Sequence, residues 1–209
     1  LTINILMLVG VLVGVAFFTL YERKVLGLIQ LRKGPNKLGL GGITQPVADA
    51  VKLILKEPTW PYMSNFNMYM LAPYLGLSIS LLAWAGTPLL SGHIDFKLSA
   101  VFFLCCLGAS VYPVMISGWA SGSKYASIGA SRSIAQSLSY EVSLAIIMLI
   151  FFMLAYTLSF KELGGFQIKV MFIILLPLAG GLWAFSTIAE LNRSPLDFAE
   201  GESELVSGF

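Results

Sequence analysis

Long apolar runs dominate the chain and are separated by short polar stretches. Four runs carry no charged residue: Leu1–Leu20, Pro58–Gly92, Leu98–Ser123 and Val170–Ala189. A fifth, Ser133–Phe160, is interrupted only by Glu141. About 20 apolar residues in a helix span the hydrocarbon core of a bilayer, so every run is long enough to cross it. The pattern predicts one all-α, polytopic transmembrane domain over 1–209, with spans at about 1–20, 66–90, 98–119, 133–159 and 169–189.

The first long polar stretch contains a helical pattern of its own. Val47, Ala50, Val51 and Ile54 recur at helical spacing and form one apolar stripe, whereas the charged residues around them take other faces. Pro46 suits the first turn of a helix and Pro58 suits its end. About a dozen residues are too few to span a bilayer. We therefore expect a short amphipathic helix over about 45–57, lying in the membrane interface.

Charge distribution adds a topology to this picture. The chain is 57% hydrophobic and only 11% charged, against about a quarter charged in soluble domains. Ten of its thirteen lysines and arginines fall in 21–57, 121–132 and the segment after the fifth span. The positive-inside rule places these loops in the cytoplasm or matrix and the N-terminus outside. The first run lacks the basic n-region of a signal peptide.

Several kinds of chemistry are disfavoured by the residues present. The stretch RKGPNKLGLGG, residues 32–42, has the glycine spacing of a phosphate loop, but Leu40 stands where that loop needs lysine. A basic stretch beside a membrane is explained by attraction to lipid headgroups, without nucleic acid. His93 is the only histidine, and Cys105 and Cys106 are adjacent inside an apolar run. We expect no metal, haem or iron–sulfur site on this chain.

Acidic residues are the remaining candidates for chemistry. Glu141 is expected one or two turns into the fourth span, where a charge costs about 2.5–3.5 kcal/mol on insertion scales. Gln136, Ser137 and Tyr140 lie nearby, so a polar stripe could line a proton or water path. The alternative is an interfacial carboxylate paired with Arg132.

A second acidic feature is AELNRSPLDFAEGESEL, directly after the fifth span. It places five carboxylates within fifteen residues with one arginine to offset them: Glu190, Asp197, Glu200, Glu202 and Glu204, with Arg193. A solvated loop is the usual interpretation of such a run. Interleaved apolar residues and the position at membrane level favour partly buried carboxylates that share protons.

Three stretches resemble a known family: YERKVLGLIQLRKGPNKLGLGGITQPVADAVKLILKE, SGWASGSKYASIGASRSIAQSLSYEV and AELNRSPLDFAEGESELVSGF. They are similar to subunit 1 of NADH:ubiquinone oxidoreductase, respiratory complex I, of the mitochondrially encoded type. The resemblance covers essentially the whole chain. It implies a core membrane subunit of a proton-pumping NADH:ubiquinone reductase, with loops that seal the quinone cavity against peripheral-arm subunits. Members of the family continue through further spans beyond residue 209, so the helices that close the tunnel are expected to be absent here.

The resemblance also implies roles for particular residues, none of them catalytic in the strict sense. The mouth of the ubiquinone access tunnel would be formed by Glu22, Arg23, Arg32, Asp49 and Phe198. The proton path would run through Tyr140, Glu141, Glu190, Asp197, Glu200, Glu202 and Glu204. Supporting positions would be Tyr125, Arg132, Gln136 and Arg193. A cation near an apolar mouth is costly unless it is paired, so we expect Arg23 and Arg32 to contact carboxylates or partner groups.

The resemblance further implies the surroundings of the chain. Ubiquinone would be the substrate, and FMN and iron–sulfur clusters would reside on partner subunits. The partners would be the quinone-cavity subunits, the membrane-arm subunits and lipids, in the mitochondrial inner membrane with the basic loops in the matrix. Membrane-bound hydrogenases share this type of subunit. Two alternatives stay open: a secondary transporter with Glu141 as its coupling carboxylate, and a structural membrane anchor.

Overall fold

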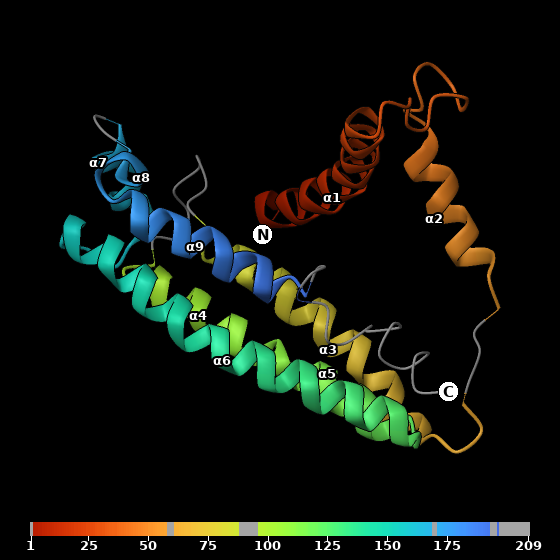
Figure 1. The fold of residues 1–209 in the computed structure, drawn as a ribbon. Coiled ribbons are helices and arrows are strands. Elements are labelled where there is room, and N and C mark those ends of the chain that lie inside the picture. Colours follow the sequence, from red (N-terminus) through yellow and green to blue (C-terminus); the bar gives the residue numbers. More distant parts are fainter. Residues whose placement is uncertain (1, 58–60, 88–95, 169–170, 193–195, 197–209) are drawn as a thin grey trace. The chain divides into compact units, whose positions relative to one another are not determined.

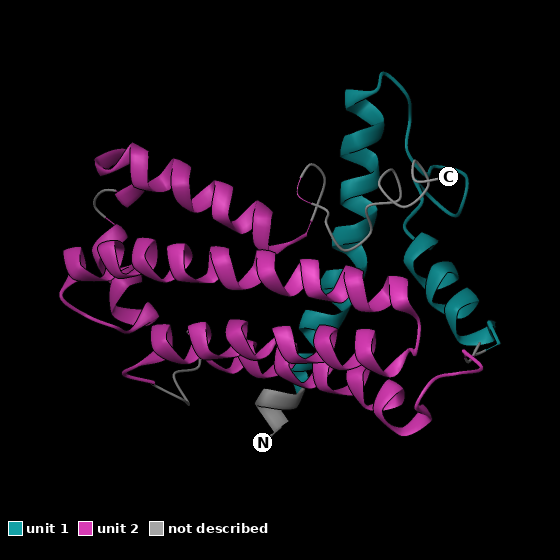
Figure 2. Cartoon of the chain, turned by 60° about the horizontal axis from the view of Figure 1, so that its bottom comes forward, with its two compact units in different colours: residues 1–59 teal, residues 60–209 magenta. Residues whose placement is uncertain are grey.

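A computed structural model describes residues 2–57, 61–87, 96–168, 171–192 and 196, and regular structure in them is helical throughout (Figure 1). Four candidate spans are long and apolar enough to cross a membrane: Leu6–Ile29, Phe66–Ala85, Ser99–Ala120 and Lys124–Ala155. The predicted all-α, polytopic class is therefore confirmed. The chain divides into two compact units, Leu1–Thr59 and Trp60–Phe209 (Figure 2).

The first unit contains α1 (Thr2–Ile29) and α2 (Gln45–Leu55). Helix α1 continues nine residues past the predicted end at residue 20, so the YERK stretch is helical. Glutamate, arginine and lysine are good helix formers, and their long stems let the charged groups reach the membrane surface. The charges therefore do not end the helix.

The end of α1 is a Schellman motif, in which the residue after the helix takes a left-handed conformation. Leu31 has φ 56°. Its N–H donates to the Leu28 carbonyl at 3.0 Å, and the Arg32 N–H donates to the Gly27 carbonyl at 2.9 Å. These two bonds satisfy carbonyls that a helix end leaves without partners. Glycine is the usual residue at this position, and leucine is costly there.

The glycines of RKGPNKLGLGG allow the following loop to fold closely. A Cβ on Gly34 would lie 2.9 Å from the Lys24 Cα of α1, so the loop could not approach the helix with a larger residue there. Gly42 has φ +81°, and its Cβ would collide with the Pro35 carbonyl oxygen. The loop thus needs glycine for close packing at one position and for backbone conformation at the other.

Helix α2 has the amphipathic character expected of residues 45–57. Pro46 lies in its first turn, and no residue of the helix is buried. Its apolar stripe stays exposed, with Val47 at 63% and Ile54 at 82%. An exposed apolar stripe on a short helix is typical of a helix that lies in a membrane interface.

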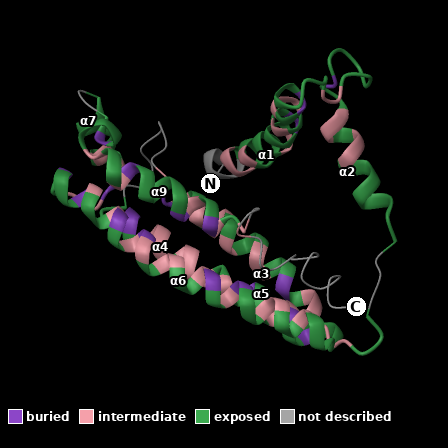
Figure 3. Ribbon diagram, in the orientation of Figure 1, coloured by how far each residue is buried: buried purple, intermediate pink, exposed green. Residues whose placement is uncertain are grey.

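The second unit contains seven described helices: α3 (Phe66–Ala85), α4 (Ser99–Ala109), α5 (Val111–Ala120), α6 (Lys124–Ala155), α7 (Phe160–Gln167), α8 (Phe172–Leu175) and α9 (Pro177–Glu190). Helix α6 packs against α5 and α9, and α3 packs against α5. The buried residues lie mainly along these contacts (Figure 3). Many of them are small, such as Ala72, Ala155 and Ala189, which lets the helix backbones approach closely.

Boundaries in the second unit also differ from the sequence prediction. The third span is two helices that meet at Ser110. The described part of the fifth is split at Leu176, before Pro177, and α9 alone is short for a span. Helix α6 begins nine residues before residue 133, because the Ser123 side chain caps it by accepting from the Ala126 N–H. Glu141 therefore lies about five turns into its helix rather than one or two.

Candidate functional site

In the first unit, an ion pair joins α1 to α2. The Arg23 Nη1 lies 2.8 Å from the Asp49 Oδ2, and both side chains are partly exposed. The Gln45 side-chain amide donates to the other oxygen of Asp49, also at 2.8 Å. The hydrogen bond from Gln45 lowers the pKa of the Asp49 carboxyl group. The hydrogen bond from Arg23 and the positive charge of Arg23 lower it further. Asp49 is therefore an anion at neutral pH, held by two donors.

The neighbouring cations of this unit have other partners. The Lys24 ammonium donates to the Gly41 carbonyl at 2.6 Å and ties the glycine loop to α1. Arg32 donates through Nε to the Gln30 side-chain oxygen at 2.9 Å. Arg23 thus contacts a carboxylate as expected, whereas the observed contact of Arg32 is a neutral amide. Glu22 is half-buried on α1, and Phe198 lies outside the described residues.

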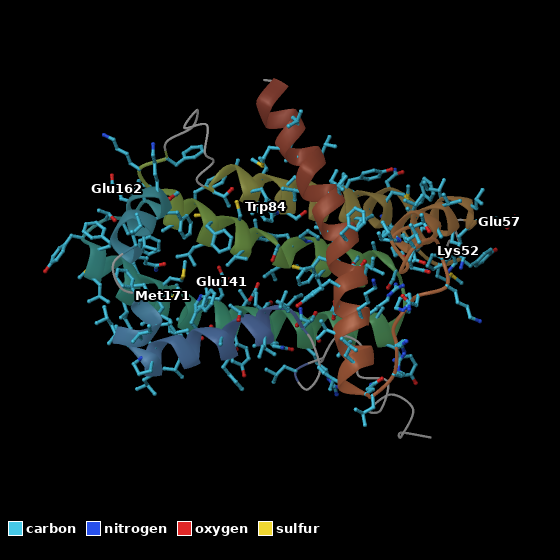
Figure 4. All side chains as sticks on the ribbon, turned by 90° about the horizontal axis from the view of Figure 1, so that it is seen from above. Lys52, Glu57, Trp84, Glu141, Glu162 and Met171 are labelled. Atoms are coloured by element: carbon cyan, nitrogen blue, oxygen red, sulfur yellow. The ribbon has the colours of Figure 1, made fainter. Side chains whose placement is uncertain are left out.

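In the second unit, α6 carries a stripe of polar side chains on one face. Ser133, Gln136, Ser137, Tyr140 and Glu141 stand at positions i, i+3, i+4, i+7 and i+8, the pattern that places side chains on the same side of a helix. Ser133 and Gln136 are buried, at 3% and 5% exposed. Glu141 lies in the middle part of this long helix (Figure 4). The stripe brings polar groups into the interior of an otherwise apolar bundle.

Glu141, at the end of this stripe, interacts through its charge with a carboxylate from another helix. Glu141 on α6 lies close enough to Glu190, the last residue of α9, for their charges to interact. Glu190 follows the last predicted span along the chain. Its burial raises the pKa of its carboxyl group, and the charge of Glu141 raises that pKa further. On the other side, a Cβ on Gly108 of α4 would lie 2.5 Å from the Glu141 Oε1. We call Gly108, Glu141 and Glu190 the carboxylate cluster.

Gln136 fixes the end of α9 against α6. Its side-chain nitrogen donates to the Ala189 carbonyl at 3.0 Å and to the Leu196 carbonyl at 2.7 Å. Ala189 directly precedes Glu190 and is fully buried. One side chain therefore holds both the helix that presents Glu190 and the start of the acidic segment.

A small cavity adjoins the cluster. Its volume is about 50 Å³, and its polar lining comes from Ser110, Ser133, Ser137, Glu190 and Asn192. Within the described part of the chain, the Glu190 Oε2 and the Asn192 Oδ1 are buried and have no hydrogen-bond partner. Buried acceptors of this kind need a donor such as water, and one water requires about 10–15 Å³. The cavity has room for more than one.

The other predicted site residues lie elsewhere. Tyr125, 66% exposed, and Arg132 lie on the exposed surface near the start of α6. Six predicted residues fall outside the described ranges: Arg193, Asp197, Phe198, Glu200, Glu202 and Glu204. Within the described ranges, no group of three or more metal-ligating side chains is found.

Sequence reasoning missed several members of the second site. Ser133 could have been found, because it continues the helical spacing of Gln136, Ser137 and Glu141. Ser110 and Asn192 carry no comparable signal, because each is a single polar residue at a helix end. Gly108 lies next to Glu141 because α4 packs close to α6 at this point. The sequence around Gly108 does not indicate this packing.

Comparison with known proteins defines the class of this chain. Residues 3–209 match the family described as NADH dehydrogenase. The chain is 52% identical over 206 residues to NADH-ubiquinone oxidoreductase chain 1 of Anopheles gambiae, covering 99% of this chain and 66% of that protein. It is 49% identical over 209 residues to the protein of the same name from Sarcophilus harrisii, covering 100% of this chain and 66% of that protein. The chain thus spans just under two thirds of the length of these relatives.

The fold and the site define a polytopic helical membrane protein with acidic groups inside its bundle. Because the family match extends over nearly every residue, the chain belongs to the NADH dehydrogenase family.

Proposed function

We propose that this chain is a core membrane subunit of a proton-translocating NADH:ubiquinone oxidoreductase. It would form part of the ubiquinone access tunnel and of an acidic path that couples the quinone cavity to the membrane arm. The family membership supports the enzyme class. The observation that carries the proton role is the charge interaction of Glu141 with Glu190, a residue that lines a polar cavity.

The electrostatics of this interaction suit proton exchange. Burial disfavours the charged form of Glu190, and the charge of Glu141 disfavours it further. Both effects raise the pKa of Glu190, so it binds a proton more readily than an exposed glutamate does. A change of charge at a bound quinone would then alter the proton occupancy of Glu190.

The cavity beside Glu190 would hold water for this path. Water in it would donate to the Glu190 Oε2 and the Asn192 Oδ1. It could also donate to the Ser133 and Ser137 hydroxyl oxygens, whose own protons go to carbonyls of α6. Carboxylates that are not in direct contact can exchange protons through hydrogen-bonded water and hydroxyl groups between them. The predicted carboxylates at 197, 200, 202 and 204 would extend this path.

The first unit would contribute to the tunnel mouth. Ubiquinone is apolar and would enter from the lipid, and α2 presents an exposed apolar stripe suited to the interface. The Arg23–Asp49 pair fixes α2 to α1 while its charges neutralise each other. Glu22, Arg32 and Phe198 are proposed as further tunnel residues.

The family membership also supports partners and location. FMN and iron–sulfur clusters would lie on peripheral-arm subunits, and the basic loops would face them from the matrix side of the mitochondrial inner membrane. Single cysteines at Lys97 and Lys124, both exposed, test this orientation in a chain whose own cysteines are replaced by serine. Labelling of both positions from the same side would contradict it.

The proton role is tested by Glu141→Gln and Glu190→Gln in the assembled enzyme. Each should lower quinone-linked turnover and proton pumping, because glutamine keeps the shape but cannot exchange a proton. Electron transfer to an artificial acceptor upstream of quinone should survive. Glu162→Gln, an exposed position on α7, is the control. Normal turnover and a normal proton-to-electron ratio in both variants would contradict the proposal.

A further inference from the structure

The glycine at 108 has an unusual environment for a helical glycine of this chain. The three nearest atoms to a Cβ built there are all from the Glu141 carboxyl group, with Oε1 at 2.5 Å and the carboxyl carbon at 3.4 Å. Contacts under 3.0 Å are essentially never made by a real Cβ. The carboxyl group of Glu141 thus occupies the space that any other residue at 108 would fill.

Other glycines show that this is not a general feature of the bundle. Gly181 on α9 has nothing within 4 Å of a built Cβ, so a methyl group would be tolerated there. Gly118 and Gly180 are crowded, but by the side chains of Ala130 and Ile173. Those two glycines serve apolar helix packing. At Gly108 the neighbour is the carboxyl group of Glu141. The absence of a side chain at Gly108 therefore leaves room for a charged group rather than for apolar packing.

We propose that Gly108 is a positioning residue, which lets the carboxyl group of Glu141 lie against the α4 backbone and sets its distance from Glu190. The inference rests on the proposed proton role for its functional consequence, but the contact itself is independent of that role. Gly108 lies two residues before Ser110, where the third span breaks and lines the cavity. A shift of the Glu141 carboxyl group would change its position relative to Glu190, which lines this cavity.

The test is a cycle of four chains in the assembled enzyme: wild type, Gly108→Ala, Glu141→Asp and the double variant. The added methyl group in Gly108→Ala must push the carboxyl group away. Aspartate withdraws the carboxyl group by about one C–C bond, roughly 1.5 Å, which makes room for that methyl group. Displacement of a reacting group by about 1 Å can cost up to a hundredfold in rate. We expect about a tenfold loss of quinone-linked turnover in Gly108→Ala and a shifted pH profile.

Rescue distinguishes positioning from general packing. Gly108→Ala combined with Glu141→Asp should assemble and turn over better than Gly108→Ala alone, and its pH profile should return toward that of Glu141→Asp. Gly181→Ala is the matched control and should stay within about twofold of wild type. If Gly108→Ala behaves like Gly181→Ala, or if the double variant shows no recovery of assembly or pH profile, the inference is overturned.

The two proposals fail separately. The thermal stability of the four assembled chains tests the contact, because two residues in contact give non-additive changes whatever Glu141 does chemically. Additive changes would overturn the positioning role. Normal pumping in Glu141→Gln would instead overturn the proton role and leave the measured contact standing.

Discussion

Arg23 and Asp49 connect α1 to α2 through an N–O contact of 2.8 Å. Because α1 and α2 are separated by the glycine loop, this pair, with Lys24 bound to the Gly41 carbonyl, helps to set the position of α2. The pair is partly exposed, so its expected role is positioning rather than stability.

We expect Arg23→Gln and Asp49→Asn each to loosen α2 without lowering the melting temperature measurably. The reason is that an exposed pair contributes little to unfolding but restrains the geometry of two elements. Spin labels at Tyr21 and Leu53, both exposed, should show a broader distance distribution in either variant. The double variant should be no broader than the singles. Lys56→Gln is the control, and additive broadening would contradict the pairing.

The same pair predicts a pH dependence. The pKa of Asp49 is lowered from its usual 3.8, first by Gln45 and then by Arg23. A group whose pKa is depressed on folding contributes its interaction above the usual pKa and loses it as the pH falls through the lower, folded value. The distance distribution in nanodiscs should therefore stay constant from neutral pH to about 5 and broaden only below about 4. Broadening near pH 6, or a similar acid response in Asp49→Asn, would contradict this assignment.

Leu31 is a position where glycine should improve the fold. Its left-handed conformation costs a residue with a Cβ roughly 1–2 kcal/mol, and the side chain is 98% exposed. Leu31→Gly should slow hydrogen exchange of the Arg32 amide, which donates to Gly27, by about fivefold or more. Leu28→Gly, within α1, is the matched control and should speed exchange, since glycine weakens a helix interior. Faster exchange in Leu31→Gly would show that the leucine side chain itself holds the turn.

Most of the fold follows from local patterns in the sequence. Charge-free runs indicate the helices, and the stripe from Val47 to Ile54 predicts α2, because each signal is contained within a few turns. The predicted helix boundaries are wrong where polar residues belong to a helix. Glu22 to Lys24 continue α1, because polar residues do not by themselves end a helix. Lys124 to Arg132 begin α6, because the N-terminal cap of that helix is Ser123.

The site is predictable only in part. The spacing of Gln136, Tyr140 and Glu141 on one helix indicates a polar face without any structure. The meeting of Glu141 with Gly108 and Glu190 depends on how α4 and α9 pack on α6. Long-range packing of this kind leaves no periodic signal in a single sequence.

The last prediction concerns Gln136. Its buried side-chain amide holds the end of α9, which carries Glu190 of the carboxylate cluster. It donates to the Ala189 and Leu196 carbonyls. In Gln136→Leu the Ala189 carbonyl would keep its bond from the Asn192 N–H at 3.2 Å, whereas the Leu196 carbonyl would lose the Gln136 donor. An unsatisfied buried polar group costs about 1–3 kcal/mol. The variant should therefore melt at a lower temperature, and the pH profile of quinone-linked turnover should shift because Glu190 directly follows Ala189.

The control is Gln167→Leu, at an exposed position at the end of α7, which should change neither quantity. Gln136→Glu separates the two effects further. Its protonated form keeps one donor, so its stability should fall as the pH rises and the carboxyl group ionises beside two carbonyl oxygens. If Gln136→Leu melts at the wild-type temperature, the amide does not hold the end of α9. If it melts lower but keeps the wild-type pH profile, Gln136 supports the helix without influencing Glu190.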